Sequence, residues 1–487
     1  LLSSNSLSTL LPSVFGKLQV VTVYVVIVAN SGVPVRVNSG PTYSGDIDLG
    51  GGTLDAQRGN TTNGSAIASG AQPGGTTTST PAATISNGTL MASGTNKTIS
   101  VGDNGSIRDL EISANLEGTF VKSGGGLALL ADNAGMTELR IASGIVIVGA
   151  EGALGSGNVI INASAAIQAA DDINAQTIDN DFTFLATGSL TLGGFEGLAP
   201  LLFTGSFLNA TSANRGFIVQ NSNTTFSGNM DLGGATTTTI NTVGSINTNA
   251  GATATFSGNL ENLVNLTKSG GGVATLSGTN TQSGLTSVTA GILRVASDGA
   301  LGDSGGTANR TNLSANASLE LVGDRTIGDE ILLLSSTTGL VNVADGSGGP
   351  FPEGEELNYP ASQLTRGVGS LRAVDGNSTW GTGETAIFLA ANPTDIFVGA
   401  GASLELNANL VGNASVTQTT GANGLLKIGS GTLILGGDVN NNYTGQTSVH
   451  EGTLVLDKAD NGLAIRRTLM VGDGQGVDIV TWNANEQ

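Results

Sequence analysis

Residues 266–302 read LTKSGGGVATLSGTNTQSGLTSVTAGILRVASDGALG, and related blocks begin at Phe120 and Leu425. Each block divides into short runs such as VATLSG, TSVTAG and ILRVAS, separated by turns rich in Gly, Ser, Asn and Asp. Runs of this kind, bounded by turn residues, are typical of β-strands. A strand-like unit that recurs with its glycines at fixed places predicts a stacked repeat architecture.

The last run of each block alternates between apolar and more variable positions. The apolar positions are Val146, Leu293 and Leu454, followed by Val148, Val295 and Leu456. Because neighbouring residues of a strand point to opposite faces, these six side chains are predicted to lie inside. The alternate positions are predicted to lie outside, where an Arg can reach water: Ile147, Arg294 and Val455, and Ile145, Ile292 and Thr453. Stacking such coils pairs each strand in parallel with its counterparts above and below. The predicted fold is all-β, a right-handed parallel β-helix (β-solenoid) with three short strands per coil, its hand following from the general preference for right-handed connections.

The spacing of the blocks predicts a longer cycle. Lys122 and Lys268 are 146 residues apart, and Lys268 and Lys427 are 159 apart. We expect each cycle to contain about six or seven coils, so that one face of the rod would present the same features periodically. The predicted organisation is an N-terminal apolar strand, cap or interface segment over 1–40 and a β-helical array over 41–487, with cycles over roughly 41–155, 156–302 and 303–465 and a further coil opening at 466–487.

Composition narrows the function classes. The net charge of −20 disfavours nucleic acid and anionic membranes as partners. The chain has no cysteine, which excludes disulfides and thiolate metal sites. The apolar stretch 18–29 is too short to span a bilayer as a helix, and its β-branched residues favour a first buried strand or cap, with a strand that pairs between chains as the alternative. No basic segment precedes an apolar core near Leu1, so we expect any signal peptide to be removed or to lie outside this sequence.

The residues KSGGG, TLSG, TSV and ALG of the blocks closely resemble the autotransporter-associated β-strand repeat of bacterial type V secreted passengers. The resemblance is most specific in the blocks at Leu266 and Leu425, is weaker at Phe120, and covers about 115 residues. It implies an extracellular β-helical rod at the bacterial cell surface, or secreted, that is exported through an outer-membrane barrel. It also implies adhesion, aggregation or surface coverage, with neighbouring subunits or a host, cell-surface or glycan ligand as partners.

The sequence offers little for catalysis, and we predict that the chain is not an enzyme and holds no cofactor. The only histidine, His450, alternates with Val449 and is predicted to be solvated, and no nucleophile motif accompanies it. A glycan hydrolase or lyase needs only two suitably placed carboxylates, so that class remains the alternative. The candidate carboxylates are Glu353, Glu355 and Glu356 in a Pro-rich excursion, and Asp171 with Asp172.

Two motifs suggest ligands only weakly. Residues 48–55, DLGGGTLD, resemble the phosphate-binding loop of the actin and Hsp70 ATPase fold, but nothing else of that fold accompanies them. Glycine and aspartate turns at 101 and 471 resemble calcium-binding turns, which makes Asp473 and Asp478 the positions to examine for a calcium-dependent rod. Tandem nonapeptides are missing, so ordinary turns are the favoured interpretation.

Asparagine is frequent at the turns. The triplets that begin at Asn87, Asn162 and Asn413 match the glycosylation pattern, which chance explains in a chain rich in Asn and Thr. We expect turn asparagines to tolerate left-handed backbone and to stack into hydrogen-bonded ladders. The leading hypothesis is a structural rod that mediates adhesion, aggregation or assembly into filaments.

Overall fold

The computed structural model describes strand segments between residues 27 and 57 and most of the chain from 84 to 483. The described residues are 27–28, 35–38, 42–43, 47–49, 53–57, and 84–483 except 87, 93–96, 103–107, 171–173, 194–198, 221, 244–251, 304–308, 316, 329, 336–369, 383–384, 414, 418–419, 460–461 and 474–475. These residues contain strands and no helix, and so no helix that could cross a membrane.

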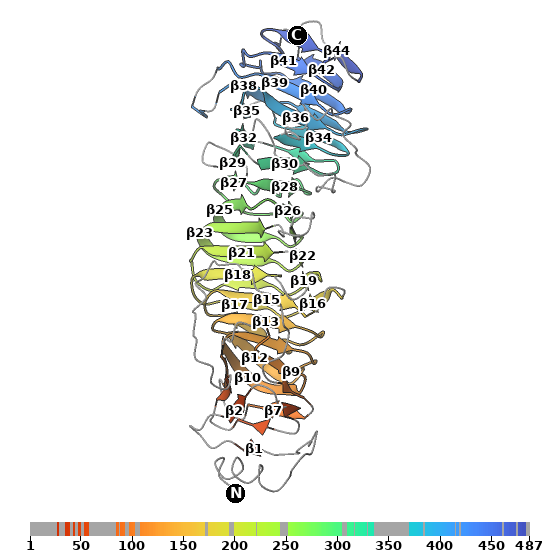
Figure 1. Ribbon diagram of the computed structural model, residues 1–487. Helices are drawn as coiled ribbons and strands as arrows, with labels where there is room; N and C mark the ends of the chain where they lie inside the picture. Colours follow the sequence, from red (N-terminus) through yellow and green to blue (C-terminus); the bar gives the residue numbers. More distant parts are fainter. Residues whose placement is uncertain are drawn as a thin grey trace, which may run out of the picture.

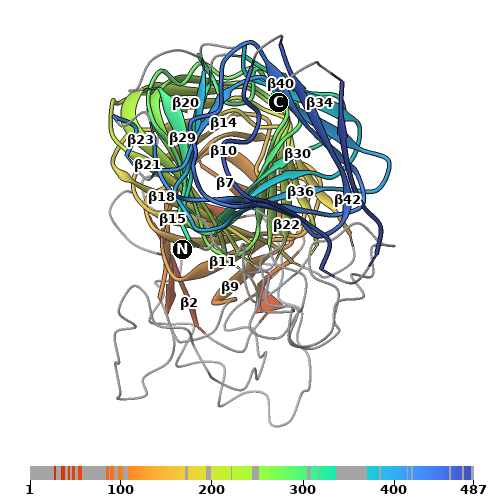
Figure 2. The same ribbon diagram turned by 90° about the horizontal axis from the view of Figure 1, so that it is seen from above.

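The strands stack into an elongated rod with the N-terminal strands at one end and the C-terminal strands at the other (Figure 1). Every pairing between named strands is parallel, for example β13 (Gly144–Val148) with β15 (Ala165–Ala169). Viewed along the rod axis, the coils superpose around a common centre (Figure 2). The predicted all-β parallel β-helix is confirmed, because the strands stack in parallel ladders on three sides of the rod.

The first side of the rod consists of two ladders of strands. One ladder covers the N-terminal part, and a second ladder, which begins at β31 (Thr326–Ile327), covers the C-terminal part. The first side consists of β2 (Val35–Asn38), β5 (Leu54–Gln57), β8 (Lys97–Val101), the end of β10 (Asn115–Gly124), β12 (Met136–Ile141), β14 (Asn158–Ile161), β17 (Phe182–Phe184), β20 (Phe207–Asn209), the starts of β23 (Met230–Val243) and β25 (Leu260–Ser269), and then β31, β34 (Asn377–Trp380), β37 (Ser403–Leu406), β40 (Thr432–Gly437), β42 (Gly452–Lys458) and β44 (Asp478–Trp482).

The second side follows the first in each coil. It consists of β3 (Thr42–Tyr43), β6 (Thr84–Ile85), β9 (Leu110–Ile112), β11 (Gly126–Leu129), β13, β15, β18 (Gly188–Leu192), β21 (Arg215–Gln220), the ends of β23 and β25, β27 (Thr286–Val288), β29 (Arg310–Leu313), β32 (Ile331–Leu334), β35 (Ala386–Leu389) and β38 (Asn409–Val411).

The third side closes the coil. It consists of β1 (Ile27–Val28), β4 (Ile47–Asp48), β7 (Thr89–Met91) and the start of β10 near the N-terminus, and then of β16 (Gln176–Ile178), β19 (Leu201–Phe203), β22 (Asn223–Phe226), β24 (Thr253–Phe256), β26 (Val273–Leu276), β28 (Gly291–Val295), β30 (Ala317–Leu321), β33 (Leu371–Ala373), β36 (Thr394–Val398), β39 (Leu425–Ile428), β41 (Thr447–Val449) and β43 (Leu469–Val471).

The core is a narrow column of inward side chains that runs along the axis. The six repeat positions predicted to lie inside, Val146, Leu293, Leu454, Val148, Val295 and Leu456, are all buried. Arg294 points outward as predicted and pairs with Glu320 at 2.5 Å. The prediction is wrong for Ile147, Ile292 and Val455, which it placed outside and which are buried. In the middle of the rod, phenylalanines from successive coils stack, with ring centroids 4.7 Å apart for Phe182 and Phe207 and for Phe226 and Phe256. These separations match the spacing of adjacent strands, so stacking follows from coil geometry.

The three repeat blocks do not occupy the same sides of the rod. The block at Phe120 pairs β10 with β12 on the first side and β11 with β13 on the second. The block at Leu266 is shifted by one side relative to the first block. Its strands β25 and β27 lie on the second side, and β26 and β28 lie on the third side. The block at Leu425 moves on again, with β39 and β41 on the third side and β40 and β42 on the first. The expectation that one face presents the repeated features periodically is therefore wrong.

The physical reason is that a cycle is not a whole number of coils. From Lys122 to Lys268 the chain completes six coils and one further side, following β11, β13, β15, β18, β21, β23 and β25. From Lys268 to Lys427 it completes five coils and one further side, following β26, β28, β30, β33, β36 and β39. The second cycle has more residues but fewer coils, because the connection from β32 to β33 alone occupies 335–370.

Candidate functional site

Each repeat block buries one lysine near the end of its first strand, beside the turn that follows. Lys122, Lys268 and Lys427 are all 0% exposed. The Lys268 ammonium donates hydrogen bonds to the carbonyls of Ser269, Gly270 and Ala290 at 2.9, 2.8 and 2.9 Å. The same lysine thus binds the turn of its own coil and the turn of the next coil.

The other two blocks reproduce this arrangement. Lys122 donates to Gly124 and Gly125 of its own turn and to Ser143 of the next coil. Lys427 donates to Ile428 and Gly429 of its own turn and to Glu451 of the next coil. We call these three arrangements the lysine clamps.

A glycine in the next coil makes room for each clamp. Gly144, Gly291 and Gly452 all have positive φ, at 83°, 68° and 75°. A Cβ on Gly291 would lie 2.4 Å from the Gly272 carbonyl oxygen and 2.5 Å from that of Gly270. Because these neighbours are backbone atoms, only glycine fits at this position.

Each block also buries an asparagine at another corner of the coil. Asn280 accepts a hydrogen bond from the Leu260 amide at 2.8 Å and donates to the Ala300 carbonyl at 2.6 Å. Asn133 makes the equivalent bonds to Leu116 and Ala153, and Asn441 makes them to Leu410 and Ala464. Each side chain joins its own coil to the coil before and the coil after, and we call these arrangements the asparagine clamps.

Burial shifts the ionisation of the clamps. Burial lowers the pKa of Lys268 to about 7. Burial also lowers the pKa of Lys427, to about 8, although Glu451 and Asp478 act in the opposite direction. The carbonyls that accept from each ammonium are fixed dipoles that stabilise its position. The lysine clamps therefore have a structural role, in which each lysine joins its own turn to the turn of the next coil.

The calcium candidates lie together in the last coil. Nδ1 of His450 is 3.9 Å from the carboxylate of Asp473, and the Asp478 carboxylate accepts a hydrogen bond from the Asp473 backbone. Burial raises the pKa of Asp478, with further contributions from Asp473 and Glu451, while His450 lowers it. Among the described residues, no group of three or more His, Asp or Glu side chains is arranged to hold a metal ion.

The prediction that His450 is solvated is wrong. Its side chain is only 12% exposed, and the next coil, which continues from β43 (paired with β41) to Asp473, places the Asp473 carboxylate 3.9 Å from Nδ1. Alternation along the strand correctly places His450 beyond inward-facing Val449, but alternation within one strand carries no information about a later coil that covers the outer face.

The remaining sequence candidates contribute no assembled site. Asp48 and Asp55 lie in β4 and β5, two ladder strands, and the glycines at 50–52 between them lie outside the described residues. Glu353, Glu355, Glu356, Asp171, Asp172 and Asn87 lie outside the described residues as well. Of the apolar stretch 18–29, Ile27 and Val28 form β1 and pair with β4.

The turn asparagines form the predicted ladder. Asn229 accepts a hydrogen bond from the Asn259 amide at 3.0 Å, and Asn259 accepts one from the Thr279 amide at 2.9 Å. Asn262, with φ of 56°, is the one described residue other than glycine with positive φ. Asn413 donates to the Thr420 carbonyl at 3.3 Å, across its own turn.

Sequence reasoning missed both clamps. A signal was present, because a lysine stands two residues into each block where the alternating pattern already places inward side chains. Lysine is almost never fully buried without partners, so the pattern was not read as burial.

A family model described as the passenger-associated-transport-repeat matches residues 266–295 and 425–456. Both matches begin at the first strand of a block and contain its lysine clamp. No curated protein and no solved structure matches the chain.

Proposed function

Because the chain carries autotransporter passenger repeats on a β-helical rod, we propose that it is an exported surface rod that mediates adhesion or self-association. The repeat family implies, in general terms, the cell surface or the extracellular space. The adhesive role is proposed from one observation on the repeats. The buried lysines and asparagines of the repeats join successive coils. Successive blocks also lie on successive sides of the rod. Both features suit a long molecule that presents surface on all three sides.

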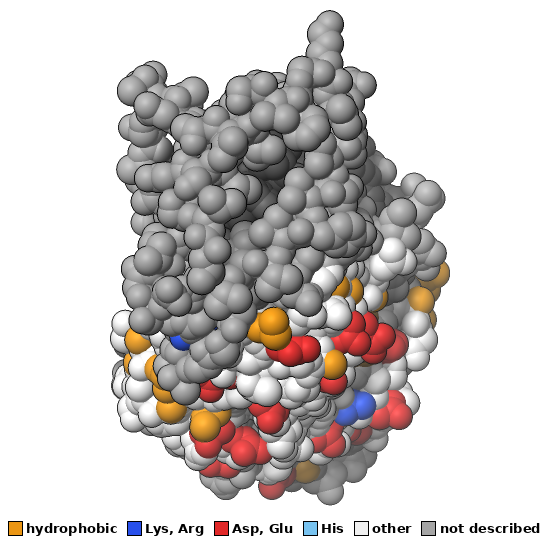
Figure 3. Space-filling model, turned by 90° about the horizontal axis from the view of Figure 1, so that it is seen from below, with side chains coloured by type: hydrophobic (Ala, Val, Ile, Leu, Met, Phe, Trp, Pro, Cys, Tyr) orange, Lys and Arg blue, Asp and Glu red, His pale blue; other side chains and the backbone are white. Residues whose placement is uncertain are grey.

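The surface is consistent with this role. Seen from the N-terminal end, the described surface carries several small groups of Asp and Glu side chains and fewer Lys or Arg side chains (Figure 3), in line with the net charge of −20. Such a charge keeps an elongated molecule soluble. It also restricts close association to patches where the carboxylates are sparse or are used for binding.

Adhesion and self-association are tested with the full 487-residue chain coupled to microspheres. We expect coated spheres to cluster with one another or to attach to bacterial or host cells, while spheres coated with the heat-unfolded chain do neither. Analytical ultracentrifugation of the same preparation measures self-association without a surface. A chain that stays monomeric, and whose spheres neither cluster nor attach, would refute the proposal.

The N-terminal apolar segment provides a second test. Its β-branched residues suit pairing between chains, so deletion of residues 18–29 is expected to abolish any filament while leaving the β-sheet spectrum of the rod unchanged. Filaments of unchanged length after the deletion would show that assembly uses another surface.

A further inference from the structure

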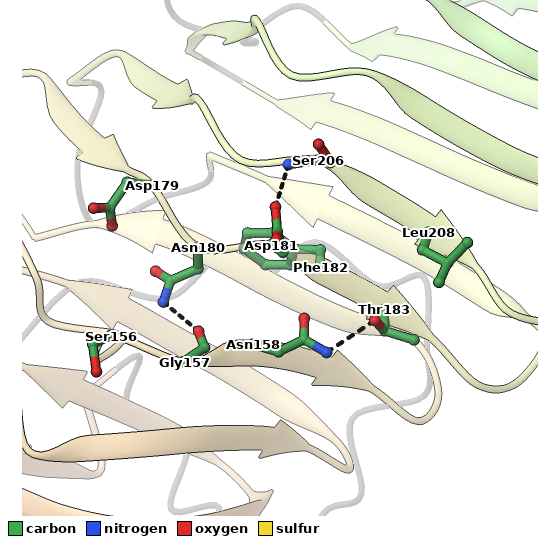
Figure 4. A pocket seen from close by; sticks show the side chains of 10 residues that line it. All are labelled: Ser156, Gly157, Asn158, Asp179, Asn180, Asp181, Phe182, Thr183, Ser206 and Leu208. Atoms are coloured by element: carbon green, nitrogen blue, oxygen red, sulfur yellow. Dashed lines mark hydrogen bonds between the residues drawn. The ribbon is translucent and has the colours of Figure 1, made fainter.

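The described surface has a polar hollow of about 530 Å³ on the first side of the rod. Three consecutive coils line it, through the turn before β14, the turn and start of β17, and the turn and start of β20 (Figure 4). Adjacent coils are about 4.8 Å apart, so the hollow extends about 10 Å along the axis. It is therefore a short groove parallel to the rod.

The walls of the hollow are held by hydrogen bonds that do not involve a ligand. Asn180 donates to the carbonyls of Gly155 and Gly157 at 2.9 and 2.7 Å and is buried. One oxygen of Asp181 accepts from the Ser206 amide at 2.7 Å. These bonds fix the turns of three coils, so little conformational entropy remains to be lost when a ligand binds.

The polar groups of the hollow are mostly acceptors. Asp179 and Asp181 are exposed at its rim, and no Lys, Arg or His lies among its lining residues. Asn158 donates to the Thr183 hydroxyl at 2.9 Å, which leaves its buried Oδ1 without a hydrogen-bond partner among the described residues. A fitting ligand must therefore supply hydrogen-bond donors, and the two carboxylates disfavour an anion.

Leu208 adds an apolar contact beside these acceptors. Its side chain is 45% exposed at the end of the hollow. A sugar ring offers hydroxyl donors beside small apolar C–H faces. An ammonium or guanidinium group gains little binding energy beside exposed carboxylates, because water and salt screen the electrostatic attraction.

We propose that this hollow binds a neutral saccharide of about two residues that lies along the rod axis. The saccharide hydroxyls donate to Asp179 and Asp181, which are exposed, and a ring face packs on Leu208. This inference rests on the adhesive function proposed above and names the class of its ligand.

The test uses the full chain on an array of neutral oligosaccharides, with the variants Asp179→Asn, Leu208→Asp and Asp303→Asn. Asp179 and Leu208 are exposed, so their replacement leaves the fold intact, and Asp303 is an exposed carboxylate elsewhere that serves as the matched control. We expect the wild type and Asp303→Asn to bind the same saccharides, and each hollow variant to bind them about tenfold more weakly, as the loss of one charged hydrogen bond or one apolar contact predicts.

Three outcomes would overturn the proposal: no neutral saccharide is bound, binding is equal in all variants, or the wild type binds only lysine-rich peptides in a salt-sensitive way. The microsphere assay separates the two levels of inference. Spheres that still attach or cluster when they carry a chain without saccharide binding would refute the hollow alone, whereas spheres that never attach would refute the adhesive function itself.

Discussion

At the scale of single residues, the buried lysines satisfy the hydrogen bonds of backbone carbonyls that the turns point inward. At each block, turn carbonyls of two coils face the interior and need donors. A lysine supplies three donors from one atom, and burial lowers the pKa of Lys268 to about 7 as the consequence of placing a charge there. The unfavourable desolvation of the lysine is thus offset by the hydrogen bonds that it donates to three carbonyls.

The replacement Lys268→Met tests this account through pH. Above pH 7 folded Lys268 loses its proton, whereas in the unfolded chain it keeps the proton up to the ordinary pKa of 10.5. The unfolded state therefore binds more protons between these values, and the free energy of unfolding is expected to rise with pH through this window. In Lys268→Met this contribution is lost, and at pH 7 the variant is less stable by about 2 kcal/mol or more, because three carbonyls lose their donor.

Denaturant unfolding at pH 7, 8, 9 and 10 measures both effects. Arg140→Met is the matched control, since Arg140 is 33% exposed and pairs with Glu138 at the surface, where such pairs contribute about 0–1 kcal/mol. An unchanged pH slope in Lys268→Met would show that the lysine clamp does not titrate in this window.

Glu330 is predicted to act in the opposite direction. It is 2% exposed, and burial raises its pKa to about 7, although a hydrogen bond from Thr311 opposes the shift. Between its ordinary value of 4.5 and pH 7 the folded state binds more protons than the unfolded state. Its contribution to stability is therefore fully present below pH 4.5 and is lost as pH rises through 7. Thermal melting from pH 4 to 8 should show this decline in the wild type and a weaker decline in Glu330→Gln, and equal profiles would contradict the assignment.

At the scale of single elements, the Lys268 clamp depends on a glycine in the next coil and tolerates a side chain at a glycine of its own turn. Gly291 has positive φ and lies against two backbone carbonyls, whereas a Cβ on Gly271 would meet nothing within 4 Å. Gly291→Ala is expected to cost several kcal/mol, because backbone must move in two coils. Gly271→Ala is expected to be neutral or stabilising by up to about 1 kcal/mol, since it restricts the unfolded chain. Melting temperatures of the two variants provide the comparison, and equal losses would show that crowding at Gly291 is not decisive.

The strands themselves could be predicted from the sequence because their signal is local. Alternation within GILRV places Leu293 inside and Arg294 outside, and both assignments are confirmed. It also places Ile292 outside, and Ile292 is buried, so alternation gives the direction of a side chain better than its exposure. The clamps depend on contacts between coils, as Asn280 shows by reaching Leu260 and Ala300 at once. A pattern within one strand cannot reveal such partners, and for the same reason it could not reveal that a later coil covers His450.

At the scale of the whole molecule, the repeats make the rod modular, and the modularity predicts the outcome of a large deletion. Lys122 and Lys268 lie at equivalent points of their blocks, six coils and one side apart. A variant that joins Lys122 directly to Ser269 therefore restores an intact block, and β26 is expected to take the place of β11 beside β9. Because each coil contacts only its neighbours, the remaining coils keep their interactions.

The joined chain should be a folded rod about 30 Å shorter than the wild type, at about 4.8 Å per coil. Its C-terminal part is also rotated by one side relative to its N-terminal part. Small-angle scattering measures the length, and far-ultraviolet circular dichroism measures the strand content. A control that joins Lys122 to Leu263 places a second strand where the turn belongs, and it is expected to aggregate. If both chains aggregate, the blocks are not interchangeable, and the inward columns of the two cycles must differ too much to be stacked on each other.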